Sequence, residues 1–63
     1  MIYFDMVFSH ETAKAVLVKY RGAEIWLPKS QCACDWFGRG LEDGDEIEIG
    51  VPHWLAQEKE MIP

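Results

Sequence analysis

Alternation of apolar and polar positions along the chain predicts mostly β-strands. Residues 2–8, Ile-Tyr-Phe-Asp-Met-Val-Phe, are rich in aromatic and β-branched side chains, which favour a strand. From Glu46 to Val51, three apolar residues alternate with two glutamates and a glycine. This period of two is typical of a half-buried strand, so residues 45–51 are expected to turn an apolar face inward and an acidic face outward.

The clearest predicted element is a hairpin over residues 13–27. Two apolar runs flank Arg21-Gly22, and a glycine that adopts positive φ suits a two-residue turn. Such a turn places Tyr20 opposite Ala23 and puts a lysine opposite a glutamate at the next pair, which supports the register. The register then divides the hairpin into a core face of Val16, Val18, Tyr20, Ile25 and Leu27, and an opposite face of Leu17, Lys19, Glu24 and Trp26.

The remaining segments predict a loop, a strand and a short terminal helix. Pro28 ends the hairpin because it has no N–H to donate. Three glycines interrupt residues 29–44, which predicts a loop with at most one short strand or turn. Pro52 suits the first turn of a helix over residues 53–61. The helix is expected to turn Trp54, Leu55 and Met61 towards the core.

Together these elements predict one small domain, residues 1–63, of the mainly β class. Four strands and a short carboxyl-terminal helix favour a small antiparallel sheet or a partly open barrel. The polar segment of residues 9–12 is expected to connect the first strand to the hairpin.

Charge is distributed unevenly along the chain. The net charge is −5; residues 1–40 carry five basic and four acidic side chains, so the whole excess of acidic residues lies after residue 40. Acidic side chains repel phosphate, which disfavours general nucleic-acid binding, and they attract basic protein surfaces. The alternative is that the acids only keep a small, apolar-rich domain in solution. The acidic residues expected to meet a partner are Asp43, Asp45, Glu46 and Glu48.

Composition also bears on location. The first residues lack the basic region and apolar run of a signal peptide, and no apolar stretch approaches the roughly 20 residues that span a membrane. Two cysteines are too few for a disulfide-rich secreted scaffold. We therefore expect a cytoplasmic protein without membrane contact.

No pattern of catalytic or metal-binding residues stands out. Cys32, Cys34, His10 and His53 are zinc-ligand types, but the Cys-x-Cys spacing lacks the turn that aims two sulfurs at one ion. Two reduced cysteines or an interchain disulfide are the simpler expectations. The chain has no phosphate-binding glycine pattern and no plausible nucleophile and base pair. We expect no enzyme activity, no metal and no cofactor.

Aromatic residues are the better candidates for contact. Trp36-Phe37 lies directly before Gly38-Arg39-Gly40, and tryptophan and arginine are enriched among the residues that dominate interface energies. Either this loop projects and anchors a partner, or its rings fold back and plug one end of the barrel. Trp26, on the hairpin face opposite the core, is the other candidate.

Three stretches carry a resemblance to a known group of proteins. The run Lys14-Ala-Val-Leu-Val-Lys, a turn glycine and Glu24-Ile-Trp-Leu-Pro-Lys-Ser-Gln31 resemble small accessory proteins of bacteriophages and prophages. The acidic strand Asp45–Ile49 and the ending Trp54-Leu-Ala-Gln-Glu-Lys59 share that resemblance. Residues 32–40 depart from that pattern. The resemblance implies a viral accessory protein in the cytoplasm of a bacterial host, and it assigns no catalytic residue.

Three classes of function follow. The first is a protein-binding module that engages, and inhibits or adapts, a host or viral complex, as inhibitors of host defence such as anti-CRISPR proteins do. The second is a nucleic-acid accessory protein, with bases stacked on Trp26 or Trp36. The third is a homo-oligomeric structural protein. Phosphate contacts in the second class would come from Lys14, Lys19, Arg21, Lys29 and Arg39.

Overall fold

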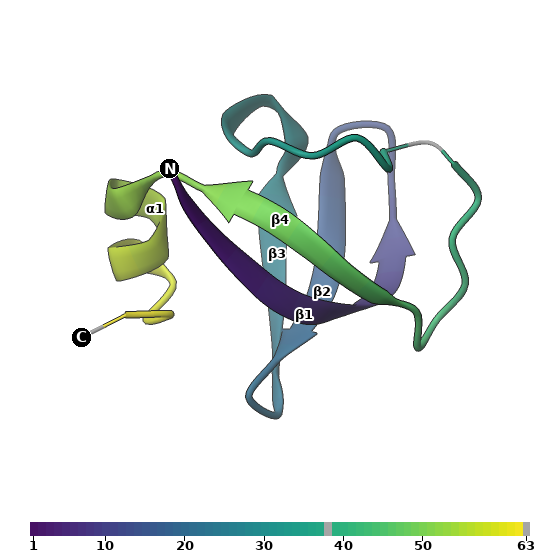
Figure 1. Ribbon diagram of the computed structural model, residues 1–63, viewed down its shortest axis with the longest axis horizontal. Coiled ribbons are helices and arrows are strands. Elements are labelled where there is room, and N and C mark those ends of the chain that lie inside the picture. Colours follow the sequence, from purple (N-terminus) through teal and green to yellow (C-terminus); the bar gives the residue numbers. More distant parts are fainter. Residues whose placement is uncertain (38, 63) are drawn as a thin grey trace.

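The computed structural model describes residues 1–37 and 39–62. It contains strands β1 (Ile2–Glu11), β2 (Ala15–Tyr20), β3 (Ala23–Pro28) and β4 (Glu46–Val51), a 3-10 turn η1 (Lys29–Gln31) and helix α1 (His53–Glu58). The strands form one antiparallel sheet in the order β3-β2-β1-β4, with α1 at one end (Figure 1). The prediction of a mainly β fold with four strands and a short terminal helix is confirmed.

The β2–β3 hairpin has the register that its turn predicts. Tyr20 pairs with Ala23, Lys19 with Glu24, and the pairing continues to Ala15 and Pro28. Arg21 and Gly22 have φ angles of 51° and 81°, the two left-handed positions that a two-residue hairpin turn requires. The hairpin therefore separates a core face from an outer face as expected.

The first strand is longer than the sequence suggests, and it is irregular. β1 pairs with β4 from Ile2 to Val7 and with β2 from Val7 to Glu11, and a bulge between Phe8 and His10 leaves Ser9 unpaired. Residues 9–11, expected to be a connection, thus belong to the strand. The bulge shifts the alternation by one residue, so Glu11 lies opposite the buried Val16 instead of facing outward. Figure 1 shows the bend in β1.

One hydrophobic cluster joins all the strands to the helix. Six residues predicted on the inward faces of the hairpin and of the last strand are all buried in it, together with residues of β1 and α1. The helix contributes Leu55 and Ala56, and Met61 follows from the turn after it. The predicted six are Val16, Val18, Ile25, Leu27, Ile47 and Ile49.

The expectation that Trp54 faces the core is wrong. Its side chain is 54% exposed. Because successive helical residues are about 100° apart, the inward direction of Leu55 and Ala56 turns Trp54 to solvent. The short helix ends in a Schellman motif: Met61 N–H donates to the Ala56 carbonyl at 2.8 Å, and Glu60 takes a φ of 58°. This turn is what brings Met61 back to the core.

Substituting a core residue tests the register. Val18→Asp buries an unpaired carboxylate at a fully buried position, so the variant is expected not to fold. Circular dichroism and dispersion of amide resonances measure this. Lys19→Asp, on the opposite face of the same strand, is the matched control and is expected to stay folded. A folded Val18→Asp protein would contradict the register.

Candidate functional site

The outer face is the side of the sheet turned away from the hydrophobic cluster. On β2 and β3 it carries Lys19 opposite Glu24 near the hairpin turn and is apolar farther from the turn. Trp26 of β3 lies directly opposite Leu17 of β2, and Ala15 lies opposite Pro28. Trp26 is 45% exposed, and its three neighbours are partly buried. The outer face therefore has a small apolar area over β2 and β3, in which the ring of Trp26 is exposed to solvent.

On β1 and β4, the outer face of the sheet is acidic. Asp5 of β1 lies directly opposite Glu48 of β4, and Glu46 lies opposite Val7. These residues line an open hollow of about 480 Å³. Like charges in directly opposed positions destabilise a sheet. Asp5 was not among the residues predicted from sequence, because only the β1–β4 pairing shows that it joins the two glutamates.

The turn before β4 adds a further acid to the rim of this face. Asp43 lies 3.7 Å from the Lys19 ammonium group, in a pair that is exposed on both sides. The Asp45 carboxylate instead accepts a hydrogen bond from the Glu42 backbone N–H at 2.9 Å, which closes the turn. Of the four acids expected to meet a partner, Asp43, Glu46 and Glu48 are thus presented outward, whereas Asp45 also has a structural role.

Trp36 does not project as an anchor, so that expectation is wrong. Its side chain is 8% exposed, its indole N–H donates to the Glu48 carbonyl at 2.9 Å, and its ring meets Phe8 edge-to-face at 5.7 Å. The alternative that the sequence left open, a plug at one end of the fold, describes its position. Burying the large ring is favourable because its polar indole N–H keeps a hydrogen bond to a carbonyl acceptor.

Phe37 and Arg39, the other loop candidates, differ from each other. Phe37 is partly buried and packs edge-to-face on Trp36 at 4.8 Å between ring centroids. Arg39 is exposed, and its backbone N–H donates to the Trp36 carbonyl at 3.1 Å. Of these two residues, only Arg39 is exposed.

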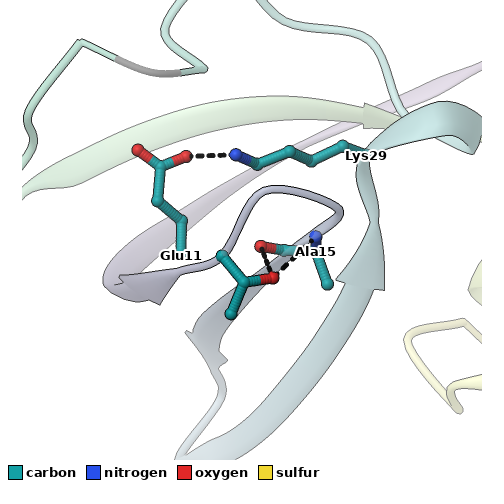
Figure 2. Close-up of polar contacts among 4 residues, drawn as sticks. Glu11, Ala15 and Lys29 are labelled. Atoms are coloured by element: carbon teal, nitrogen blue, oxygen red, sulfur yellow. Dashed lines mark hydrogen bonds and ion pairs between the residues drawn. The ribbon is translucent and has the colours of Figure 1, made fainter.

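An ion pair closes the same end of the core. The Lys29 ammonium group lies 2.8 Å from the Glu11 carboxylate, and each side chain is 17% exposed (Figure 2). The same ammonium group lies 5.4 Å from the centre of the Phe37 ring. Figure 2 also shows Ala15, whose backbone N–H donates to the Thr12 hydroxyl at 3.1 Å in the turn between β1 and β2. These contacts hold the end of the sheet together, so Glu11 and Lys29 are structural.

The two cysteines, candidate metal ligands by residue type, lie in the segment that follows η1. Cys32 and Cys34 are free and partly buried. Burial, and secondarily the neighbouring Cys34, raises the pKa of the Cys32 thiol from 9.0 to about 11. Within residues 1–37 and 39–62, no three His, Cys, Asp or Glu side chains gather as a metal site would require.

Comparisons with known proteins add no assignment. No family model, curated protein or solved structure matches the chain significantly. In the described residues, no helix has the length and apolar character needed to cross a membrane. The candidate site is therefore defined by geometry alone: the outer face, with Trp26 at one end and Asp5, Asp43, Glu46 and Glu48 at the other.

Trp36 is expected to contribute to stability. Trp36→Ala removes a buried ring and should lower the free energy of unfolding by about 3–5 kcal/mol. Trp36→Phe retains an aromatic ring but loses the hydrogen bond to Glu48, and should cost about 1–2 kcal/mol. Urea denaturation measures both. Trp54→Ala, at an exposed position, is the control and should change stability little; equal effects at the two tryptophans would refute the plug.

Cys32 is expected to be slow to alkylate in the folded protein. With a pKa of about 11 instead of 9.0, its thiolate fraction at pH 8 is about a hundredfold smaller than in the unfolded chain. Iodoacetamide labelling followed by peptide mapping measures the rate at Cys32 with and without urea. Equal rates in the two conditions would show that the folded environment does not protect this thiol.

Proposed function

We propose that the protein is a non-enzymatic binding module that engages a protein partner through the outer face of its sheet. The observation that carries this proposal is the direct opposition of Asp5 and Glu48 on the face that also exposes Trp26. The opposed carboxylates cost stability, and no described contact of the fold requires them. A basic partner surface would relieve that repulsion, and an aromatic side chain at the other end supplies an anchor.

The resemblance to bacteriophage and prophage accessory proteins supports a more specific form of this proposal. The partner is then a host or viral protein complex in the bacterial cytoplasm, which the module inhibits or adapts, as an anti-CRISPR protein does. Carboxylates that follow one another along β4 suit a basic channel that otherwise holds nucleic acid, because they present negative charge in a row.

Nucleic-acid binding has less support than protein binding. Lys19 is paired with Asp43 and Lys29 with Glu11, so two of the basic residues expected to contact phosphate already have carboxylate partners. Trp36, one of the two expected stacking platforms, is buried. The exposed acids on the face of Trp26 would repel a strand that stacked there.

Charge reversal on the outer face tests the proposal. Glu46→Lys with Glu48→Lys should remove the binding of specific partners from bacterial lysate, identified by quantitative mass spectrometry. Asp35→Lys with Glu58→Lys makes the same change of net charge at two exposed positions elsewhere, and should keep those partners. With a purified partner, the double substitution Glu46→Lys and Glu48→Lys should mainly lower the association rate, as added salt does.

The aromatic anchor is tested separately with the same partner. Trp26→Ala should raise the dissociation rate at least tenfold, which corresponds to about 1.4 kcal/mol. The exposed Trp54→Ala serves as the matched control. The proposal is wrong if both the charge-reversed variant and Trp26→Ala still bind the same partner proteins. It is also wrong if the protein binds single-stranded nucleic acid and neither change affects which proteins it captures.

A further inference from the structure

The two edges of the sheet differ in how their backbone groups are satisfied. On the β4 edge, Gly50 exchanges two backbone hydrogen bonds with Ala33, at 2.8 and 2.7 Å, and the Glu48 carbonyl accepts the Trp36 indole N–H. On the β3 edge, no strand of the described chain lies beside the sheet. One edge is thus covered by the loop after η1, and the other is open.

The hairpin register shows which β3 groups are open. In a two-residue hairpin, the pair next to the turn, Tyr20 and Ala23, exchanges hydrogen bonds, and every second residue thereafter does the same. Ile25 therefore bonds to β2, whereas the N–H and C=O groups of Glu24 and Trp26 point away from the sheet. No backbone hydrogen bond from elsewhere in the described chain reaches these two residues.

A groove runs along this open edge. It has a volume of about 550 Å³ and is bounded by the hairpin end, by β3 from Ala23 to Trp26, and by Lys59 and Glu60. Ile25 is 9% exposed and Trp26 is 45% exposed, so β3 offers apolar contact on both faces of an added strand. The far wall is held by the Schellman turn at Glu60, which ties Met61 to the core.

We propose that an extended peptide segment of a partner protein adds to β3 as a fifth, antiparallel strand. The inference rests on the proposed function and names the part of the partner that the module recognises. Four hydrogen bonds would form, two with Glu24 and two with Trp26. The side chain opposite Glu24 is basic, the one opposite Trp26 is aromatic or β-branched, and the residue between them is apolar and faces inward beside Ile25.

A second copy of this chain fits the edge less well. Antiparallel self-pairing centred on Ile25 places Glu24 opposite Trp26 of the copy and Arg21 opposite its Lys29, so no acid meets a base. Centring on Glu24 opposes two carboxylates. Centring on Trp26 places Glu24 opposite Pro28, which has no N–H to donate. A foreign strand with a basic residue opposite Glu24 supplies an opposite charge, which none of these three self-pairings does.

The test uses the folded protein and a blocked probe peptide, acetyl-Thr-Tyr-Ile-Lys-Val-amide. Its tyrosine is designed to pair with Trp26 and its lysine with Glu24. In an NMR titration, the backbone amides of Glu24 and Trp26 should shift most and become protected from hydrogen exchange. Methylating the peptide nitrogen of tyrosine or lysine, which faces β3, should weaken binding at least tenfold, whereas methylating that of isoleucine should change it little.

Charge exchange supplies a second arm. Glu24→Lys should weaken the lysine peptide and favour the same peptide with glutamate in place of lysine. Strand addition is overturned if millimolar peptide leaves the Glu24 and Trp26 amides unshifted, or if methylation at isoleucine is as harmful as at its neighbours. It is also overturned if these amides become protected with rising protein concentration alone, since that identifies a second copy as the occupant.

The two proposals fail in distinguishable ways. If lysate partners are lost with the Glu46→Lys and Glu48→Lys pair but kept with Glu24→Lys, the outer face binds and the strand addition is wrong. If the probe peptide binds with the expected methylation pattern and the outer-face pair loses no partner, strand addition stands and the acidic face is not the binding surface.

Discussion

β1 pairs with two strands at once, and the rest of the structure depends on that double pairing. Its first half pairs with β4 and its second half with β2, and Val7 belongs to both ladders. The strand bends in order to serve both neighbours, and the bulge at Ser9 takes up the change of direction. A single sheet of four strands thereby curves around one hydrophobic cluster, to which the six-residue helix adds Leu55 and Ala56.

The bulge also determines how the open end of that cluster is closed. It turns Glu11 inward, where the carboxylate meets Lys29, and Lys29 in turn lies over the ring of Phe37. Phe37 packs on Trp36, and Trp36 packs on Phe8 of β1. A loop with little regular structure is thus held to the sheet by aromatic packing and by the indole hydrogen bond to β4. In so small a domain, each of these contacts is a large share of the net stability.

This closure leaves a particular set of groups for binding. The core uses Trp36, and the loop covers the β4 edge, so the exposed aromatic rings on the outer face are those of Tyr3 and Trp26, and the open edge is that of β3. The acidic end of the outer face lies on β1 and β4, whereas the groove lies along β3. Glu24 and Trp26 belong both to the outer face and to the β3 edge. A partner that supplies a basic extended segment would engage the two surfaces together.

Much of the architecture is encoded in local pattern. The hairpin register follows from a two-residue turn with glycine, and the alternation in β4 predicts both its core residues and its outward glutamates, because side chains on a strand alternate strictly between faces. The helix position follows from Pro52, but the direction of Trp54 does not, since a rotation of the helix by one residue, about 100°, exchanges Trp54 for Ala56 on the inward face. The composition likewise indicates an acidic carboxyl-terminal half without showing where those acids gather.

The features that the pattern leaves open all depend on contacts between residues distant in sequence. Whether Trp36 projects or plugs is settled by an acceptor on Glu48 and a ring on Phe8, neither of which local sequence places nearby. The inward turn of Glu11 requires a bulge, whose position reflects the competing demands of β2 and β4 on β1. The opposition of Asp5 and Glu48, and the open edge at β3, arise only when the strand order is set. Strand order is decided by burying apolar faces against one another, which is a property of the assembled sheet and not of any one segment.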